Sequence, residues 1–401
     1  MIQFNACGSK FAGIWKGTVR DMLFIKSDKL KIGMRLAKPI YNKNGVMLYE
    51  RNSKLTNQGI VSIQNFGLIG VYILEPAEPL PPMSADDIEF ERFQAMSVFT
   101  IKEILDQIAK KNDSKELYPF ANQVIKRYGN LHHKINFVQN LRSAEDCVYK
   151  HALNTAILCA LLSKKLKFEF KAQLDVVVAG LLYDIGNLLV PVSLRKLKSD
   201  ELTEEDKTKI NTYHLAGYQI LSQSYDLDPS VKRNATLICK ELYDLGDIDD
   251  LSYTKRIPEL EILKVAATFD NMTAMKYEEE PLSEIAAVQY LLDENNGFDQ
   301  EVVQALVESI NILNPGVCVE LSNGEKGLVI TEGSINVLQP FVLSFKDNRI
   351  INLSEDSVAE ELHIVDIMKT MDNRHVVAGD MFQRYVGETV QMGKPRKKKH
   401  Y

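Results

Sequence analysis

Three side chains in the middle of the chain are of types that bind metal ions. His151 opens the apolar run HALNTAILCALL, His214 lies in YHLAGYQIL, and Asp184 is the carboxylate within LLYDIGNLL. A charged carboxylate in an apolar segment is costly unless it is paired, hydrogen-bonded or bound to a metal. Taken singly, each residue is more simply a satisfied core or surface side chain. Their order and spacing along the chain favour a shared site.

The segments around these residues resemble the HD-GYP family, the HD-superfamily phosphodiesterases that cleave cyclic di-GMP. Family members carry a helix that begins with His, a helix ending in His-Asp-Ile-Gly-Lys, and a His shortly before a Gly. A His-His-Glu and an Asp-Gly-x-Gly-Tyr-Pro loop, an Asp-x-Tyr-Asp-Ala-Leu helix and a β segment follow. The matching stretches here are YKHALNTA, GLLYDIGNLLVP, YHLAGYQIL, CKELYDLGDID, KVAATFDNMTA and NPGVCVELSNGEKGLV. The resemblance covers about residues 141–330, and the module before it is similar to one often found upstream in this family.

The resemblance implies that the metal site of the family is only partly kept. His151, Asp184 and His214 match three of its ligand positions. Four further ligand positions carry other residues, namely Tyr183, Cys239, Lys240 and Ala267. The three matching positions are therefore interpreted as remnants of a binuclear site, and no catalytic residue is expected.

The substrate side of the family site is also altered. Asn187 stands where the family has a lysine thought to hold the substrate phosphate, and Lys276 stands in place of an arginine. Asp247-Ile248-Asp249 replaces the Gly-Tyr-Pro signature, whereas Glu241 and Asp270 match the family pattern.

Hydrolysis of a phosphodiester at a binuclear centre needs two cations about 3.5–4 Å apart, which activate a hydroxide and neutralise the phosphate. With the three matching ligands, each ion would have two protein ligands, too few for tight binding. We expect Tyr183 to fill the core, and Lys240 to line the pocket beside Asp184 or Glu241, where its ammonium would compete with a cation. We predict no cofactor, or else iron, manganese or zinc at low occupancy. We also predict that His151, Asp184 and His214 lie within about 12 Å of one another.

Two other roles remain open for residues of this site. The thiolate of Cys239 with His214 and Asp184 would make a three-ligand zinc site, although a small buried cysteine is the simpler interpretation. Lys240 and Lys276 are candidate phosphate contacts if no metal is present.

Three functions therefore compete. The first is a catalytically silent HD-GYP-type module of cyclic-dinucleotide signalling that binds a protein partner. The second is a receptor that binds cyclic di-GMP without hydrolysis, and the third is an active metal-dependent phosphodiesterase with a rearranged metal site. The loss of four ligand positions favours the first, so the sequence leans toward a protein that is not an enzyme.

The elements that would position this site are helices. Apolar residues recur at steps of three and four from about residue 85 to 314, as in YKHALNTAILCALLSKKL and LDVVVAGLLYDIGNLLV. The predicted fold class is therefore mainly α, an HD-type helical domain with a small N-terminal α/β module and a small C-terminal β appendage.

The flanking segments differ from this helical pattern. Residues 1–74 combine short β-type runs, a turn signal at residues 42–45, a short helix and a last strand, GVYIL. Residues 75–84 hold four prolines and predict an extended linker. Residues 315–390 begin with a hairpin signal at Asn323-Gly324, and residues 391–401 are a basic tail, predicted to be solvated.

Composition narrows the choice of partners. The chain has 48 basic and 54 acidic residues and a net charge of −6, which disfavours nucleic acid as a partner. Its five scattered cysteines contain no CxxC pair and suggest no disulfide framework. The sequence shows no evident signal peptide and no apolar run near the roughly 20 residues of a membrane span. A cytoplasmic location without a membrane span is the resulting prediction.

Overall fold

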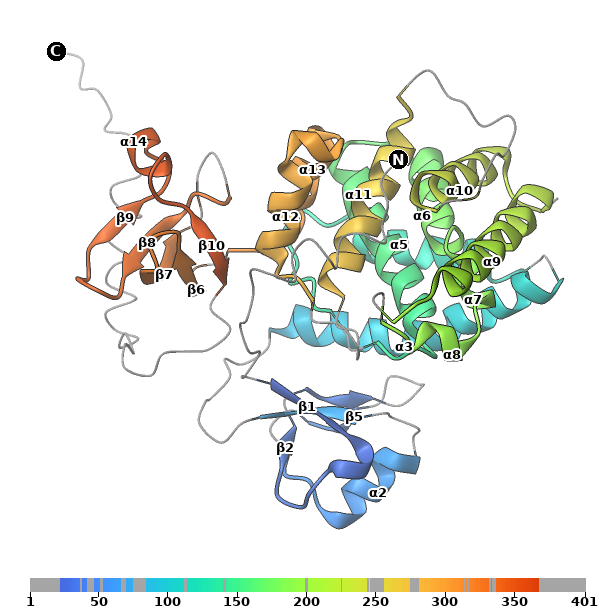
Figure 1. The fold of residues 1–401 in the computed structure, drawn as a ribbon, viewed down its shortest axis with the longest axis horizontal. Coiled ribbons are helices and arrows are strands. Elements are labelled where there is room, and N and C mark those ends of the chain that lie inside the picture. The colour runs from blue at the N-terminus through green and yellow to red at the C-terminus, as the bar shows by residue number, and fades with distance from the viewer. Residues whose placement is uncertain are drawn as a thin grey trace. The chain divides into compact units, whose positions relative to one another are not determined.

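The computed structural model describes two compact units. The described residues are 22–36, 38–41, 47–50, 53–65, 70–74, 84–111, 114–139, 142–198, 201–224, 226–243, 245, 256–274, 281–313, 315, 317–331, 333 and 337–367. The first unit comprises mainly Met22–Leu282 and Ala287–Ile310, and the second is built mainly from the residues after Asn311. Figure 1 shows helices in most of the first unit and a sheet in the second. The prediction of a mainly helical chain with a small N-terminal module and a C-terminal β appendage is confirmed.

Helix α5 is the centre of the helical region. Most of its residues are buried, on all sides of the helix, as expected for a helix that is apolar all round. Helices α3, α4, α6, α11 and α13 pack against it. The helices of this region are α3 (Ala85–Lys111), α4 (Leu117–Tyr128), α5 (Cys147–Lys165), α6 (Phe170–Leu182), α7 (Ile185–Leu189), α8 (Val192–Arg195), α9 (Glu204–Gln223), α10 (Pro229–Leu242), α11 (Pro258–Thr273), α12 (Glu284–Leu292) and α13 (Gln300–Val307).

Local sequence signals fix where two of these helices begin. At α9, the Thr203 hydroxyl accepts a hydrogen bond from the Asp206 N–H, and the Asp206 carboxylate accepts one from the Thr203 N–H, both at 3.1 Å. This reciprocal capping satisfies N–H groups that a helix start leaves without partners. At α10, Asp228 accepts from the Ser230 N–H at 3.1 Å, and Pro229 occupies the first turn, where its missing N–H costs nothing. These caps therefore fix the residues at which the helices that carry His214 and Cys239 begin.

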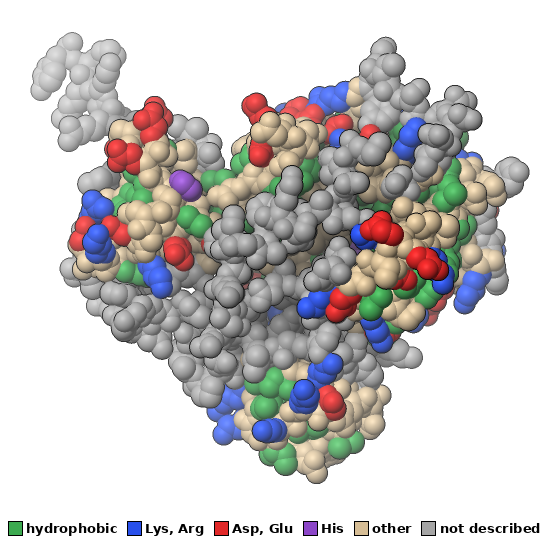
Figure 2. All heavy atoms as spheres, viewed as in Figure 1, with side chains coloured by type: hydrophobic (Ala, Val, Ile, Leu, Met, Phe, Trp, Pro, Cys, Tyr) green, Lys and Arg blue, Asp and Glu red, His purple; other side chains and the backbone are tan. Residues whose placement is uncertain are grey.

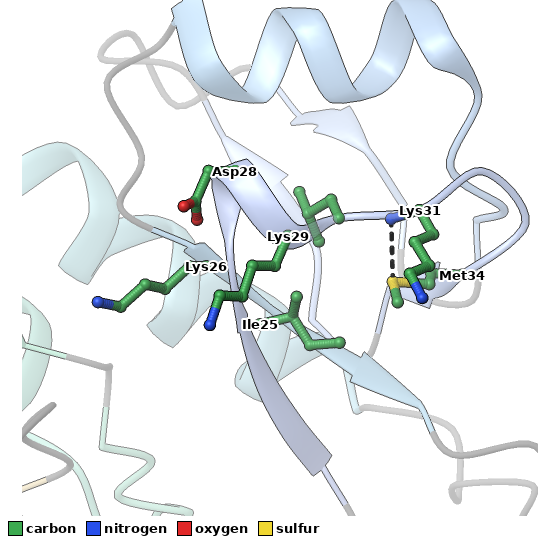
Figure 3. Close-up of a pocket in the computed structure, with 7 residues that line it drawn as sticks. Ile25, Lys26, Asp28, Lys29, Lys31 and Met34 are labelled. Carbon is green, nitrogen blue, oxygen red and sulfur yellow. Dashed lines mark hydrogen bonds between the residues drawn. The ribbon is translucent and has the colours of Figure 1, made fainter.

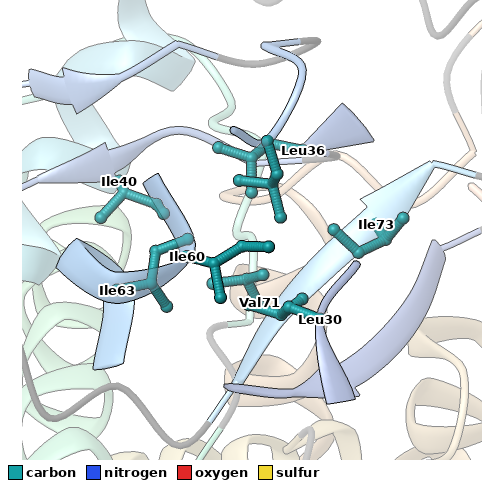
Figure 4. Packing of buried hydrophobic residues seen from close by; sticks show 8 residues of the cluster. Leu30, Leu36, Ile40, Ile60, Ile63, Val71 and Ile73 are labelled. Atoms are coloured by element: carbon teal, nitrogen blue, oxygen red, sulfur yellow. The ribbon is translucent and has the colours of Figure 1, made fainter. Parts of the chain in front are cut away.

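The N-terminal module is a small α/β structure. Strands β1 (Met22–Lys26), β5 (Gly70–Leu74) and β2 (Arg35–Leu36) form one antiparallel sheet in that order, and β3 (Ile40–Tyr41) pairs with β4 (Met47–Tyr49). Helix α2 (Asn57–Asn65) contributes Ile60 and Ile63 to the core that these elements share, as Figure 4 shows. The predicted turn at residues 42–45 and most of the predicted linker lie outside the described residues.

The second unit is an antiparallel sheet. Its strands are β6 (Cys318–Leu321), β7 (Lys326–Thr331), β8 (Phe341–Ser344), β9 (Ile350–Asn352) and β10 (Ile364–Ile367), in the order β10-β6-β7-β8-β9. The short helix α14 (Asp356–Ala359) precedes β10. The hairpin predicted at Asn323-Gly324 joins β6 to β7, and Gly324 has a φ of 79°, which favours glycine. The basic tail lies outside the described residues.

One described stretch, Phe170–Leu189, is long and apolar enough to cross a membrane, contrary to the expectation that no such run exists. Of its most apolar window, 72% is buried inside the fold. A core helix meets the same criteria of length and hydropathy, so the stretch is weak evidence for a span. On the face drawn in Figure 2, basic and acidic side chains are interspersed over the helices and the C-terminal sheet.

Candidate functional site

A buried carboxylate on α11, Asp270, is the centre of a polar cluster in the helical core. Its Oδ1 accepts hydrogen bonds from Arg142 Nη2 at 2.5 Å, from Gln139 Nε2 at 2.9 Å and from Asn154 Nδ2 at 2.9 Å. Its Oδ2 lies 2.5 Å from His151 Nδ1. Asp270 is 0% exposed. These donors replace the water that the carboxylate loses on burial.

Arg142 supplies the countercharge for this carboxylate. Burial pushes the pKa of Asp270 upward, but the Arg142 guanidinium and the hydrogen bond from His151 outweigh burial and hold that pKa below its usual range. Arg142 is only 2% exposed, so both charges of the pair are removed from water. A carboxylate that stays ionised in such a place requires a fixed cation beside it.

Both ring nitrogens of His151 are used within the protein. Its Nε2 is hydrogen-bonded to the hydroxyl of Tyr183. Burial, followed by the charges of Asp184 and Asp270, raises the pKa of Tyr183 well above its usual value, so the phenol is protonated. We therefore assign its O–H as the donor to Nε2, which leaves the Nδ1–H to donate to Asp270. No lone pair of His151 remains for a metal ion.

A second polar cluster surrounds Asp184, where α6 ends and α7 begins. Asn187 Nδ2 donates to Asp184 Oδ1 at 2.6 Å, and Asn187 Oδ1 lies 2.8 Å from His214 Nε2. The Tyr243 hydroxyl also donates to Asp184, and the Tyr243 ring stacks on the His214 ring with centroids 3.9 Å apart. Burial lowers the pKa of His214, opposed by Asp184. Asn187 thus stands between the carboxylate and the imidazole.

Two glycines bring α7 and α9 into the contact that this second cluster needs. A Cβ atom on Gly217 would lie 2.4 Å from Gly186 Cα, and a Cβ atom on Gly186 would lie 2.8 Å from His214 Cα. Real Cβ atoms do not approach other atoms so closely, so only glycine allows the two backbones to touch here. This close approach is what places Asn187 against His214.

The two clusters connect the three sequence-predicted ligand positions through other side chains. His151 contacts Tyr183, which directly precedes Asp184, and Asp184 reaches His214 through Asn187. Among the residues that the structure describes, no three His, Cys, Asp or Glu side chains are placed so that they could hold a metal ion. The described residues therefore do not fit a binuclear metal centre.

The other positions at which this chain departs from the family pattern differ in how deeply they are buried. Ala267, on the helix that carries Asp270, is fully buried. Cys239 is buried and donates its S–H to the Tyr183 carbonyl at 3.0 Å, and burial raises the pKa of its thiol. Lys276 lies outside the described residues.

Lys240 corrects the sequence-based expectation. It is exposed, not enclosed in the pocket, and Glu241 pairs instead with Lys264 at 3.8 Å. The reason is helical geometry: Cys239 and Leu242 take the buried side of α10, which turns Lys240 toward water. An ammonium that stays in water avoids the desolvation that burial would impose.

Four residues of the clusters were missed in the sequence. They are Gln139, Arg142, Asn154 and Tyr243. Asn154 follows His151 by three residues, a spacing that puts both on one helix face and could have revealed it. Arg142 gave no such signal, because its partner Asp270 is distant in sequence.

A cavity of about 580 Å³ lies in the N-terminal module, and none of its lining residues belongs to these clusters. Its lining includes Ile25, Lys26, Asp28, Lys29, Lys31 and Met34. Figure 3 shows Lys26 and Lys29 reaching to one side of the cavity and Lys31 to the other. Because the ammonium groups do not converge, we assign no anion site there.

Comparison with known proteins identifies the region that holds the site. A family model described as an HD domain matches residues 136–302, which include both clusters. A cyclic di-GMP phosphodiesterase of Pseudomonas aeruginosa is 22% identical over 211 residues, which cover 51% of this chain and 49% of that protein. The chain therefore aligns with about half the length of this curated relative. A solved HDG"Y"P protein from Bdellovibrio bacteriovorus superposes with a TM-score of 0.42 at 13% identity, covering 71% of this chain and 98% of that one. The HD-domain match and the similarity to this phosphodiesterase agree with the resemblance of the sequence to the HD-GYP family.

Proposed function

We propose that this chain is a catalytically silent HD-GYP protein that acts in cyclic-dinucleotide signalling by binding a protein partner. One observation carries the proposal: the Tyr183 hydroxyl is hydrogen-bonded to Nε2 of His151, the first histidine of the family's ligand pattern. The phenol fills the coordination direction that a metal ion would need. Its high pKa disfavours the phenolate, the form that would be a strong ligand.

The charge balance of the core supports the same proposal. In a metal-dependent phosphodiesterase, cations neutralise both the ligands and the phosphate. Here the Arg142 guanidinium already neutralises Asp270, the carboxylate that His151 contacts. A divalent cation entering this cluster would face that fixed positive charge and a protonated phenol.

The side of the site that would hold substrate gives further support. Asn187, which replaces the family's phosphate-binding lysine, has both ends of its amide engaged, by Asp184 and by His214. A neutral amide held in this way offers no positive charge to a phosphate. A cyclic di-GMP receptor is the second candidate, because Lys240 is exposed on α10 and can reach a phosphate in solvent.

Hydrolysis and binding of cyclic di-GMP test these functions separately. We expect no hydrolysis by the purified chain in the presence of iron or manganese, with an active HD-GYP phosphodiesterase as positive control. Calorimetric titration with cyclic di-GMP should show no heat of binding for a partner-binding module. Binding that Lys240→Ala abolishes would favour the receptor. Metal-dependent turnover would contradict the silent module.

A variant that puts the family's ligand residues back at the four altered positions tests those positions directly. The variant that combines Tyr183→His, Cys239→His, Lys240→His and Ala267→Asp should bind more iron, manganese or zinc than the wild type. Hydrolysis can still fail in this variant, because Asn187 and the changed Gly-Tyr-Pro segment remain. An unchanged metal content would show that these positions do not correspond to the family's ligands.

A further inference from the structure

Helix α3 presents an exposed stripe that carries an apolar residue in its first turn and two more near its middle. Ile88, Met96 and Phe99 are 37%, 37% and 50% exposed. Arg92 and Glu103 are exposed at positions that continue the same stripe, because steps of three and four residues follow one face of a helix. The opposite face of α3 is buried in the helical core, with Phe93 and Ile101 among its residues. Met96 and Phe99 are neighbours on this stripe, one helical turn apart, and together they form an exposed apolar surface that can associate.

A groove adjoins this stripe. It has a volume of about 260 Å³ and is lined by residues of α3 and α4, among them Phe93, Met96 and Phe120. The Arg127 guanidinium lies 4.9 Å from the centre of the Phe93 ring and pairs with Glu89 at the rim of the groove. Met96 therefore belongs both to the stripe and to a partly apolar depression that can receive a side chain.

We propose that α3 of a second copy of this chain packs antiparallel on this stripe and forms a symmetric dimer. The two-fold axis crosses the helix between Ser97 and Val98. In this register Met96 faces the partner's Phe99, and Phe99 faces the partner's Met96, so that each Phe99 ring lies above the other copy's groove. Each contact occurs twice, as the symmetry of an isologous interface requires.

The charges along the stripe favour the antiparallel packing of a second copy of the chain. The same register sets Arg92 opposite the partner's Glu103 and Lys110 opposite the acidic first turn that contains Asp86. A parallel pair would instead set Arg92 against Arg92 and Glu103 against Glu103, and like charges that face each other are repulsive. The stripe is thus complementary to itself only when the helices run in opposite directions.

Sedimentation equilibrium of the full chain tests the dimer and its register. The wild type is compared with variants in which a charge of the stripe is reversed. We expect a dimer for the wild type. Arg92→Glu alone and Glu103→Arg alone each place two like-charge pairs in the interface, so each should raise the dimer Kd at least about tenfold. The combined variant restores opposite charges at both ends and should return Kd to within about threefold of the wild type.

Two further variants complete the test. Phe99→Asp should abolish the dimer, and Lys209→Glu, an exposed charge reversal on α9, should leave Kd unchanged. Circular dichroism melting is used to check that each variant folds. A wild-type monomer at ~100 µM would overturn the proposal. A dimer that is indifferent to Phe99→Asp would also overturn it, and failure of the combined variant to restore Kd would overturn the antiparallel register.

Discussion

Asp270 and Arg142 form a buried ion pair whose members depend on each other. The guanidinium and the carboxylate are 2% and 0% exposed, and their atoms lie 2.5 Å apart. Removing one partner of such a pair leaves a charge in the core without compensation, whereas removing both leaves neutral groups. Three further side chains donate to the same carboxylate. These residues therefore act as a unit in stability, and their substitutions should not be additive.

Arg142→Met should destabilise the chain by about 3–5 kcal/mol, because Asp270 is then buried without its cation. The double variant Arg142→Met with Asp270→Asn should lose less stability than the sum of the losses in the two single variants. Urea unfolding in a double-mutant cycle measures both effects. Lys126→Met, at an exposed position of α4, is the control for loss of a basic side chain and should change stability by about 0.5 kcal/mol or less. Additive losses would show that the two side chains are independent.

Tyr183→Phe removes a single hydroxyl and should cost about 1–3 kcal/mol, because His151 Nε2 is left buried without a partner. Tyr128→Phe changes another mostly buried tyrosine, one whose hydroxyl makes no hydrogen bond among the described residues, and serves as the control. Chemical unfolding compares the two. Equal losses would mean that the contact between Tyr183 and His151 contributes nothing.

At the scale of elements, the contact between α7 and α9 positions the second cluster. The helices approach at Gly186 and Gly217, with no room for a Cβ atom between them. Their sequence signal is slight, since single glycines inside helices usually only lower helix stability. The contact explains why Asn187 and His214 meet although their helices are separated by α8.

Gly217→Ala should force α7 and α9 apart and destabilise the chain by about 1–3 kcal/mol or more. The side chains of Asn187 and His214 should separate as a result, visible as a shift of the His214 ring resonances in NMR spectra. Gly59→Ala in α2 provides the contrast, because its Cβ would come no closer than 3.4 Å to a neighbour. That variant should be neutral or more stable. A stable Gly217→Ala variant with unchanged His214 resonances would contradict the close packing.

Asp228 links the start of α10 to α6, and its ionisation makes a pH-dependent contribution to the free energy of unfolding. Lys171, which lies 2.7 Å from Asp228, and hydrogen bonds from Ser230 lower the pKa of Asp228 to about 2. Because this pKa is below its value of 3.8 in the unfolded chain, the stabilisation is complete above about pH 4. It is lost as the pH falls through about 2.

Asp228→Asn should therefore lower the free energy of unfolding by about 1 kcal/mol at pH 6, a figure reduced by the partial exposure of the ion pair. The difference from wild type should shrink below about pH 4, as protonation removes the same charge from the wild type. Urea unfolding at pH 6, 4 and 3 measures this difference. A difference that is constant over this range would mean that capping by the neutral side chain, rather than the charge, is responsible.

At the scale of the whole molecule, the elements were more predictable than the site. The helical pattern and the Asn323-Gly324 hairpin are local signals, and the structure confirms both. The resemblance to the HD-GYP family agrees with the HD-domain match and with the similarity to a cyclic di-GMP phosphodiesterase. Asp270 was noted in the sequence, but its partner Arg142 lies 128 positions away, and no local pattern encodes such a pairing. Lys240 was misplaced because a family position does not say whether a new side chain stays inside or turns to water.

The central proposal is that hydrogen bonds among the chain's own side chains take the place of the metal centre that the HD-GYP resemblance implies. Its most direct test is the metal content of the full chain after equilibration with excess iron, manganese or zinc and removal of unbound ions. We predict substoichiometric metal, with Tyr183→Phe unable to raise it. Two ions bound per chain, with retention that depends on His151, Asp184 and His214, would contradict the proposal.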